Sequence, residues 1–216
     1  MKQQPAPALE DAPVQLEEEW ANALTHGIAL VLSIGLSCYM MFRANEHGIG
    51  MMIACGAYSI SMIGTFCFSW LSHTILRQPA LNRLRAWDQA MIYLMISGTY
   101  TPIAFKFSTD SIKPFLLTAI WIAAFSGFIA KVAIKHRINS ITTVTYLLLG
   151  WLPAIPLIGH VTKEMGLMML LGGVLYSVGI IFLRLSEKVR YFHAVWHVFV
   201  LLAAVGHWLG ILWYVL

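Results

Sequence analysis

Histidines at the ends of two long apolar segments are the residues of this chain best suited to chemistry. His73 closes the segment that ends Ser69-Trp-Leu-Ser-His73, and His193 and His197 open the segment that begins His193-Ala-Val-Trp-His197. Because helical residues four positions apart lie on one face, with Cβ atoms about 5 to 6 Å apart, His193 and His197 can bind one ion. Three imidazoles with a fourth position open to water are the ligand set of a catalytic zinc. Imidazole sites also accept iron, copper, cobalt and nickel, so the spacing indicates a metal more firmly than it identifies zinc.

A hydroxyl and a carboxylate occur at the same depth as these histidines. Ser69 lies one helical turn from His73, and Asp88 opens the next apolar segment on the same side of the membrane. Acidic residues in apolar segments are costly and often functional. We expect Asp88 to act as general base and then acid, and Ser69 to orient a water or a developing oxyanion. The spacing leaves open a simpler interpretation, in which these are ordinary polar residues at a membrane boundary.

Apolar residues dominate the composition and indicate the fold class. Of the 216 residues, 59% are hydrophobic and 11% are charged, which is too few charges for the surface of a soluble domain. Each membrane span needs roughly 20 apolar residues, so the chain has room for about seven. The apolar runs are too long for barrel strands, and we therefore predict an all-α, polytopic membrane protein. The net charge of +4 comes from basic residues in short turns, which argues against nucleic acid as a partner.

Seven apolar runs, bounded by charged residues, glycine or proline, predict a seven-helix transmembrane bundle. Pro102, Pro153 and Pro156 are expected to kink the helices that contain them. Residues 1–18 form a short acidic segment without the layout of a cleaved signal, so we expect residues 19–216 to form the transmembrane domain. The expected helices lie near residues 21–42, 49–74, 87–106, 114–134, 141–158, 166–184 and 192–215.

The distribution of basic residues predicts the orientation of this bundle. Ten Lys and Arg residues fall on the side that holds the N-terminus and four on the opposite side, which favours a cytoplasmic N-terminus and an external C-terminus. The histidines, Ser69 and Asp88 are then expected at the cytoplasmic side of a bacterial inner (plasma) membrane. The ten are Lys2, Arg77, Arg83, Arg85, Lys131, Lys135, Arg137, Arg184, Lys188 and Arg190, and the four are Arg43, Lys106, Lys113 and Lys163.

Three polar residues share one face at the start of the first helix. Glu19, Asn22 and His26 follow one another at spacings of three and four. They form either a helix cap and interface cluster, or an outer layer of partners around the histidine ligands. His207 lies ten residues beyond His197, about 15 Å along a helix, so we expect it to be a buried, hydrogen-bonded residue outside the site. The remaining histidines fall in turns and are expected to face solvent: His47, His136 and His160.

Motifs along almost the whole chain, from about Glu18 to the end, resemble the hemolysin III family. That family belongs to the progestin and adipoQ receptor superfamily, which includes the adiponectin receptors. The chain differs at Gln89, where many bacterial relatives have histidine after the aspartate. The motifs that carry the resemblance are Glu19-Trp-Ala-Asn22-Ala-Leu-Thr25-His26-Gly27, Ser69-xxx-His73, Asp88 followed by Gly98-Thr-Tyr-Thr-Pro102, and His193-xxx-His197.

The resemblance implies a zinc ion near the cytoplasmic face. It implies that the positions of His73, His193 and His197 hold the ion, and that those of Asp88 and Ser69 contact a water. It also implies an N-in, C-out bundle, an activity on lipid amides similar to that of the alkaline ceramidases, and a role in membrane-lipid homeostasis. The hemolysin name implies pore formation.

We therefore expect a zinc-dependent hydrolase whose substrate is the amide or ester of a membrane lipid. A second hypothesis is a non-catalytic membrane sensor or homeostasis factor, in which zinc joins two helices and stabilises the bundle. A transporter or pore is a third, but the polar cluster is confined to one side of the membrane rather than the midplane where transport sites lie. The sequence predicts no particular protein partner.

Overall fold

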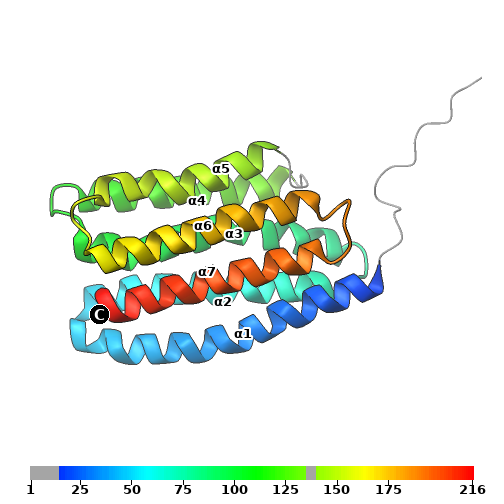
Figure 1. Ribbon diagram of the computed structural model, residues 1–216, viewed down its shortest axis with the longest axis horizontal. Coiled ribbons are helices and arrows are strands. Elements are labelled where there is room, and N and C mark those ends of the chain that lie inside the picture. Colours follow the sequence, from blue (N-terminus) through cyan, green and yellow to red (C-terminus); the bar gives the residue numbers. More distant parts are fainter. Residues whose placement is uncertain (1–14, 135–139) are drawn as a thin grey trace, which may run out of the picture.

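Helices account for nearly all of the chain that the structure covers. The computed structural model describes residues 15–134 and 140–216, and this part contains seven α-helices and no strand (Figure 1). The predicted all-α fold is confirmed. The helices are α1 (Leu16–Ala44), α2 (Ile49–Thr74), α3 (Ala80–Phe107), α4 (Lys113–Ile134), α5 (Ser140–Trp151), α6 (Lys163–Leu185) and α7 (Phe192–Tyr214), with short 3-10 helices η2 (Asn45–His47) and η3 (Leu152–Leu157).

Five of these helices are long and apolar enough to cross a membrane, namely α1, α2, α4, α6 and α7. The helix α3 falls short because polar residues lie along it, including Ser97, Thr99 and Thr101, which are buried inside the bundle. The helix α5 has only 12 residues. Pro153 and Pro156 lie in η3, the 3-10 helix that follows, because proline removes an α-helical hydrogen bond. The chain is therefore a multi-pass membrane protein with at least five candidate spans.

Two helices begin earlier than their apolar runs predict. The helix α1 starts at Leu16 rather than near residue 21, and α3 starts at Ala80 rather than near residue 87. Acidic residues in the first turn of α1 suit the positive end of the helix dipole. Helices also extend beyond the apolar core of the membrane, and hydropathy does not predict these polar ends. As a result Arg85 lies on a helix and not in a turn, and Glu19 lies within α1, as its spacing from Asn22 and His26 predicts. The expectations for residues 1–14 and for His136 fall outside the described residues.

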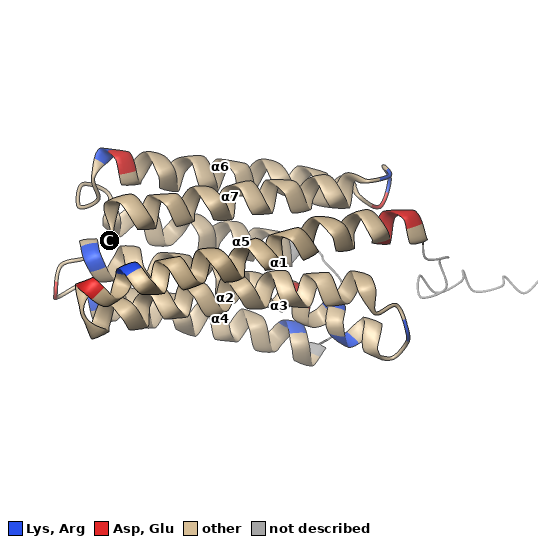
Figure 2. Ribbon diagram, turned by 90° about the horizontal axis from the view of Figure 1, so that it is seen from below, with Lys and Arg blue, Asp and Glu red and all other residues tan. Residues whose placement is uncertain are grey.

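Charged residues gather at the two ends of the bundle, and the middle is almost free of them (Figure 2). The helices lie side by side along the long axis, with the start of α1 and the C-terminus at opposite ends (Figure 1). We call the end where α1, α3 and α7 begin and α2 ends the histidine end. Among the described residues, seven Lys and Arg belong to the histidine end and four to the other. The seven are Arg77, Arg83, Arg85, Lys131, Arg184, Lys188 and Arg190, and the four are Arg43, Lys106, Lys113 and Lys163.

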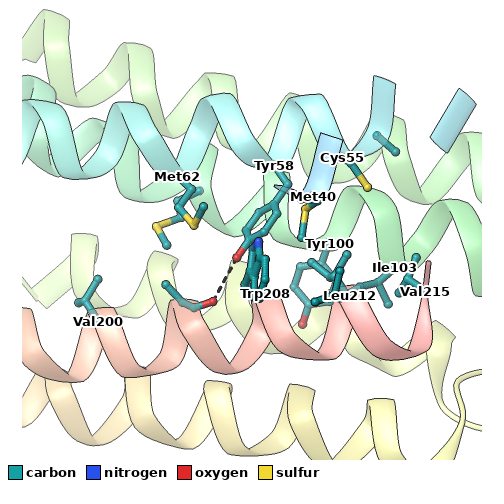
Figure 3. Packing of buried hydrophobic residues seen from close by; sticks show 14 of the residues in the cluster. Met40, Cys55, Tyr58, Met62, Tyr100, Ile103, Val200, Trp208, Leu212 and Val215 are labelled. Atoms are coloured by element: carbon teal, nitrogen blue, oxygen red, sulfur yellow. Dashed lines mark hydrogen bonds between the residues drawn. The ribbon is translucent and has the colours of Figure 1, made fainter. Parts of the chain in front are cut away.

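The core holds α7 against α1 and α2 through hydrogen bonds as well as apolar packing. The Tyr58 hydroxyl on α2 donates to the Ala204 carbonyl on α7, 3.2 Å away, as Figure 3 shows. From the other side, the Trp208 indole on α7 donates to the Leu36 carbonyl on α1 over 3.1 Å. The fully buried Met40 and Met62 fill the space around these contacts. These contacts fix α7, the helix that carries two of the predicted metal ligands.

Close approach of α2 and α3 depends on Gly98. A Cβ atom at Gly98 would overlap the Ser61 hydroxyl and lie 3.2 Å from the Ala57 carbonyl oxygen, both on α2. Small residues at helix interfaces allow backbones to approach in membranes, where packing rather than the hydrophobic effect drives association. This close contact sets the position of Asp88, ten residues earlier on α3, against the end of α2.

We expect Gly98→Ala to destabilise the purified protein by about 1 to 3 kcal/mol, because the added methyl group forces α2 and α3 apart. Thermal unfolding in detergent measures this. Gly35→Ala is the matched control, since nothing lies within 4 Å of its added Cβ atom on α1. The double variant Gly98→Ala with Ser61→Ala should regain part of the loss. Equal thermal stability of Gly98→Ala and Gly35→Ala would contradict the proposed contact.

Candidate metal centre

The three predicted ligands come together at the histidine end. One ligand atom from each of His73, His193 and His197 lies within 4.8 Å of the other two. Their ring centroids are 4.6 Å apart for the α7 pair and 5.1 Å apart from His73 to each of the others. His73 and His197 are buried, and His193 is partly exposed. The sequence spacing therefore predicted the convergence of side chains from α2 and α7 correctly.

Hydrogen bonds orient His73 so that one ring nitrogen is free for a metal. Nδ1 of His73 lies 2.5 Å from a carboxylate oxygen of Glu19, and the other oxygen of Glu19 accepts from Arg85 over 2.8 Å. Because an ionised carboxylate only accepts, the proton of the neutral imidazole resides on Nδ1. The opposite nitrogen, Nε2, is buried and has no hydrogen-bond partner among the described residues. Such carboxylate–histidine pairs are the usual outer partners of metal ligands.

The orientation of His197 is fixed in the same way by Thr25. The Thr25 hydroxyl already donates to main-chain carbonyls of its own helix, those of Ala21 at 3.0 Å and Asn22 at 2.9 Å. It therefore accepts from Nδ1 of His197, which lies 3.1 Å away. Again the proton is held on Nδ1, and Nε2 keeps the lone pair that a metal requires.

A polar group of four residues lies beside the histidines. The Ser69 hydroxyl lies 2.6 Å from Nδ1 of His26 and also interacts with the Asp88 carboxylate. Ser72 lies 3.2 Å from Asp88 and bonds to the Ser69 carbonyl over 2.9 Å. Neither Asp88 nor Glu19 belongs to the group of three ligand atoms found among the described residues. Asp88 therefore contacts this polar group and not the three ligand atoms, and its role in proton transfer stays a prediction.

Helix α1 contributes more to the site than its sequence indicates. The ring of His26 stacks on that of His197, with centroids 3.6 Å apart and an angle of 15° between planes. Together with the contacts of Glu19 and Thr25, this favours the second of the two interpretations of the Glu19, Asn22 and His26 cluster, an outer layer around the ligands. Asn22 is buried, and its side-chain oxygen has no partner among the described residues.

Three contacting residues were missed by sequence reasoning. Thr25 was noticed only as part of a motif, although its position one residue before His26 and near the face of Glu19 is a usable signal. Arg85 was assigned to topology because it was expected in a turn, and Ser72 received no role. Their contacts join different helices, so spacing along the chain carries little information about them.

Ion pairs at the surface join α1 to the segment before α7. Arg190 bonds to Glu17 over 2.8 Å and to Glu18 over 3.2 Å, and these hydrogen bonds raise the pKa of its guanidinium. The pairs are largely exposed to solvent, where each contributes little to stability. Arg190 lies three residues before His193, so its pairs with Glu17 and Glu18 keep the start of α7 close to α1.

The donor set fits a zinc ion. Tetrahedral zinc with bonds of about 2.0 to 2.1 Å places its ligand nitrogens roughly 3.4 Å apart. The three nitrogens of this site need only small side-chain movements to reach that spacing, and the unpartnered Nε2 of His73 gains the partner that a buried polar atom requires. Three neutral imidazoles leave a fourth position for water or substrate.

Apart from His26, the other histidines in the described part of the chain lie away from this centre. His47 and His160 are exposed, as predicted. His207 is buried on α7, as predicted, with Nε2 3.5 Å from the Met169 carbonyl oxygen. Its Nδ1 has no partner among the described residues, which the sequence did not suggest.

Comparison with known proteins identifies the family of this chain. The sequence model of the family described as "Haemolysin-III related" matches residues 14–208. The chain is 37% identical to Hemolysin-3 of Bacillus cereus, over 93% of both chains. It is 34% identical to a Hemolysin-3 homolog of Bacillus subtilis (strain 168), over 92% of this chain and 95% of that one. A more distant relative, monocyte to macrophage differentiation factor of Homo sapiens, is 24% identical over 90% of this chain and 83% of its own. The chain therefore belongs to the haemolysin III-related family of membrane proteins.

Proposed function

We propose that this protein is a zinc-dependent hydrolase that cleaves an amide or ester bond of a membrane lipid. The observation that carries the proposal is the convergence of three histidine nitrogens beside a carboxylate and a hydroxyl, all at one end of an apolar bundle. His73, His193 and His197 would hold the ion. A site that only stabilised the fold would have no need of the Asp88, Ser69 and His26 group next to its open position.

Bound zinc would polarise the carbonyl of the substrate and make a water more acidic. Asp88 would accept the proton of the attacking water and return it to the leaving nitrogen or oxygen. The Ser69 hydroxyl lies between His26 and Asp88 and has a single proton to donate. Once Asp88 has taken up the proton of the water, Ser69 would turn its own proton from Asp88 to the developing oxyanion. Glu19 and Thr25 would keep their histidines in the orientation that presents Nε2.

A groove between α1 and α2 supports a lipid substrate. It encloses approximately 700 Å³, and Glu19 and His73 contribute to its lining. The rest of its lining is almost entirely apolar and includes the exposed side chains of Leu24 and Ile28. An acyl chain lying in this groove would bring its polar linkage to the histidine end while remaining in an apolar environment.

The proposal includes a membrane topology of seven spans with the histidine end in the cytoplasm. Seven of the described Lys and Arg residues lie at the histidine end and four at the opposite end, which supports this orientation. The helices α3 and α5, although less apolar than the others, lie alongside α4 and α6 in the bundle (Figure 1). In a bacterial cell the reaction would then take place at the cytoplasmic face of the inner (plasma) membrane.

A second candidate is a non-catalytic membrane homeostasis sensor in which zinc joins α2 to α7. The observation that favours it is that the ligands come from these two helices, so that bound metal would restrain their separation. The two candidates differ in what they require of Asp88. Hydrolysis needs its carboxylate, whereas a structural link does not.

We expect Asp88→Asn to lower hydrolysis by about 10² to 10⁴-fold while the protein retains its zinc, because the proton acceptor is lost and the ligands are intact. Release of fatty acid from a broad panel of lipid amides and esters measures activity, and elemental analysis measures zinc. Asp110→Asn is the matched control, since this exposed carboxylate lies at the opposite end of the bundle.

Two results would decide against hydrolysis. One is a zinc-loaded parent protein that releases no fatty acid from the panel, together with unchanged lipid pools in a deletion strain. The other is an Asp88→Asn variant as active as its parent. If zinc removal then lowers the melting temperature, the structural candidate replaces the catalytic one.

We expect Glu19→Gln to weaken zinc binding by about 10- to 100-fold, because the uncharged amide holds the proton of His73 less firmly on Nδ1. Competition with a chelator of known affinity measures the change. Glu17→Gln is the control, because Glu17 lies on the same helix but pairs with Arg190 at the surface. His73→Ala should bind far less zinc than either variant. Equal affinities of the Glu19→Gln and Glu17→Gln variants would refute the role of Glu19.

Reporter fusions test the topology. Alkaline phosphatase, which is active only outside the cytoplasm, should be active when fused after Leu216 and inactive when inserted after Glu187, in the connection between α6 and α7. A green fluorescent protein fusion at the same two positions should give the opposite pattern. Activity of both phosphatase fusions, or of the Glu187 insertion alone, would contradict the proposed orientation.

A further inference from the structure

A second cavity lies among α3, α5, η3, α6 and α7. It encloses approximately 450 Å³ and is lined mostly by apolar side chains, among them Ile103, Met169 and Val200. Two aromatic residues in its wall, Tyr176 on α6 and His207 on α7, carry buried polar atoms without a partner among the described residues. Buried polar groups are nearly always hydrogen-bonded, so these two atoms call for an explanation.

The structure fixes which hydrogen bond His207 can make. Its Nε2 lies 3.5 Å from the Met169 carbonyl oxygen, which can only accept, so the proton of the neutral imidazole is on Nε2. Nδ1 is therefore an acceptor that needs a donor. The ring cannot easily turn away, because it packs against the backbone at Gly172, where a Cβ atom would overlap it. The residue as a whole is only 8% exposed.

Tyr176 supplies the complementary group. Its ring centroid lies 5.9 Å from that of His207, and its hydroxyl is buried without a partner. Other tyrosines that line the cavity are satisfied: the Tyr100 hydroxyl donates to the Gly150 carbonyl and that of Tyr146 to the Gln89 carbonyl. Tyr176 can therefore donate its proton to a group inside the cavity.

We propose that this cavity binds the hydroxyl group of a long-chain alcohol or a similar hydroxyl-bearing lipid. The ligand hydroxyl would donate to Nδ1 of His207 and accept from the Tyr176 hydroxyl, while its hydrocarbon fills the apolar remainder. Ethers, esters and ionised carboxylates lack the proton that His207 requires, and ammonium groups lack the lone pair that Tyr176 requires. Each of these ligands would leave one of the two polar groups unpaired, which disfavours it relative to a hydroxyl.

This site is separate from the metal centre. His207 follows His197 by ten residues on α7, which corresponds to about 15 Å along the helix axis. The inference therefore does not rest on the proposed hydrolysis, and it would hold for a protein in which zinc is only structural.

The test uses the full chain in phosphatidylcholine nanodiscs and a long-chain alcohol that carries a photoreactive diazirine in its chain. We expect this probe to label peptides of α6 and α7, identified by mass spectrometry. Dodecanol should block labelling at about a tenfold lower concentration than dodecyl methyl ether, which accepts but cannot donate. In His207→Leu this ratio should fall to about one, because the acceptor that distinguishes the two compounds is gone. In Tyr176→Phe both compounds lose the hydrogen bond that they accept, so both should block labelling more weakly while the ratio stays near ten.

Three controls make the outcome specific. Tyr146→Phe should leave both blocking concentrations and their tenfold ratio as in the parent, because its hydroxyl already has a partner outside the ligand. His73→Ala should also keep it, which separates this site from the metal centre. Tyr176→Phe should melt no lower than the parent, since it removes an unsatisfied hydroxyl without removing the ring. Equal blocking by the alcohol and the ether in the parent protein, or labelling that avoids α6 and α7, would overturn the proposal and assign the cavity to water.

Discussion

Polar atoms withdrawn from water need partners, and this constraint organises the histidine end of the bundle. Arg85 holds Glu19, Glu19 holds His73, and the free nitrogen of His73 faces the other two imidazoles. An unsatisfied amide or hydroxyl in an apolar medium costs roughly 2 to 7 kcal/mol. Each residue in this hydrogen-bonded series therefore restricts the orientation of the next. These hydrogen bonds alone bring the three imidazoles into an arrangement that a metal ion could occupy.

The outer layer of this centre comes mainly from one helix that contributes none of its ligands. Glu19, Thr25 and His26 all lie on α1, and they contact His73, His197 and Ser69 respectively. Hydrogen bonds such as that from Trp208 to the Leu36 carbonyl hold α1 against α7 farther along. The position of α1 thus determines the orientation of both α2 and α7 side chains, and a small tilt of this helix would affect all three contacts together.

The sequence was sufficient for features that follow a local period and insufficient for contacts between distant helices. Apolar runs located the helices, and the four-residue spacing of His193 and His197 predicted a shared face. Convergence with His73 followed because alternate helix ends meet on one side of a membrane. Thr25 and His197 are 172 positions apart in the sequence, and no pattern within α1 predicts their contact. The early start of α3 was missed because hydropathy records the apolar core and not the end of a helix.

The composition of α3 has a consequence for how the protein is made. The helix α3 has 28 residues, which is long enough to cross a membrane, but it is too polar to count as an apolar span. Its polar residues include Asp88 and the buried hydroxyls of Ser97, Thr99 and Thr101. A segment of this kind enters the bilayer poorly on its own and is retained when neighbouring segments satisfy its polar groups. Its partner α2 precedes it from the ribosome and presents Ser61 and Ala57 at the point where Gly98 fits. We therefore expect α3 to take its place in the bundle by packing on α2, which is synthesised first, and the position of Asp88 to depend on that contact.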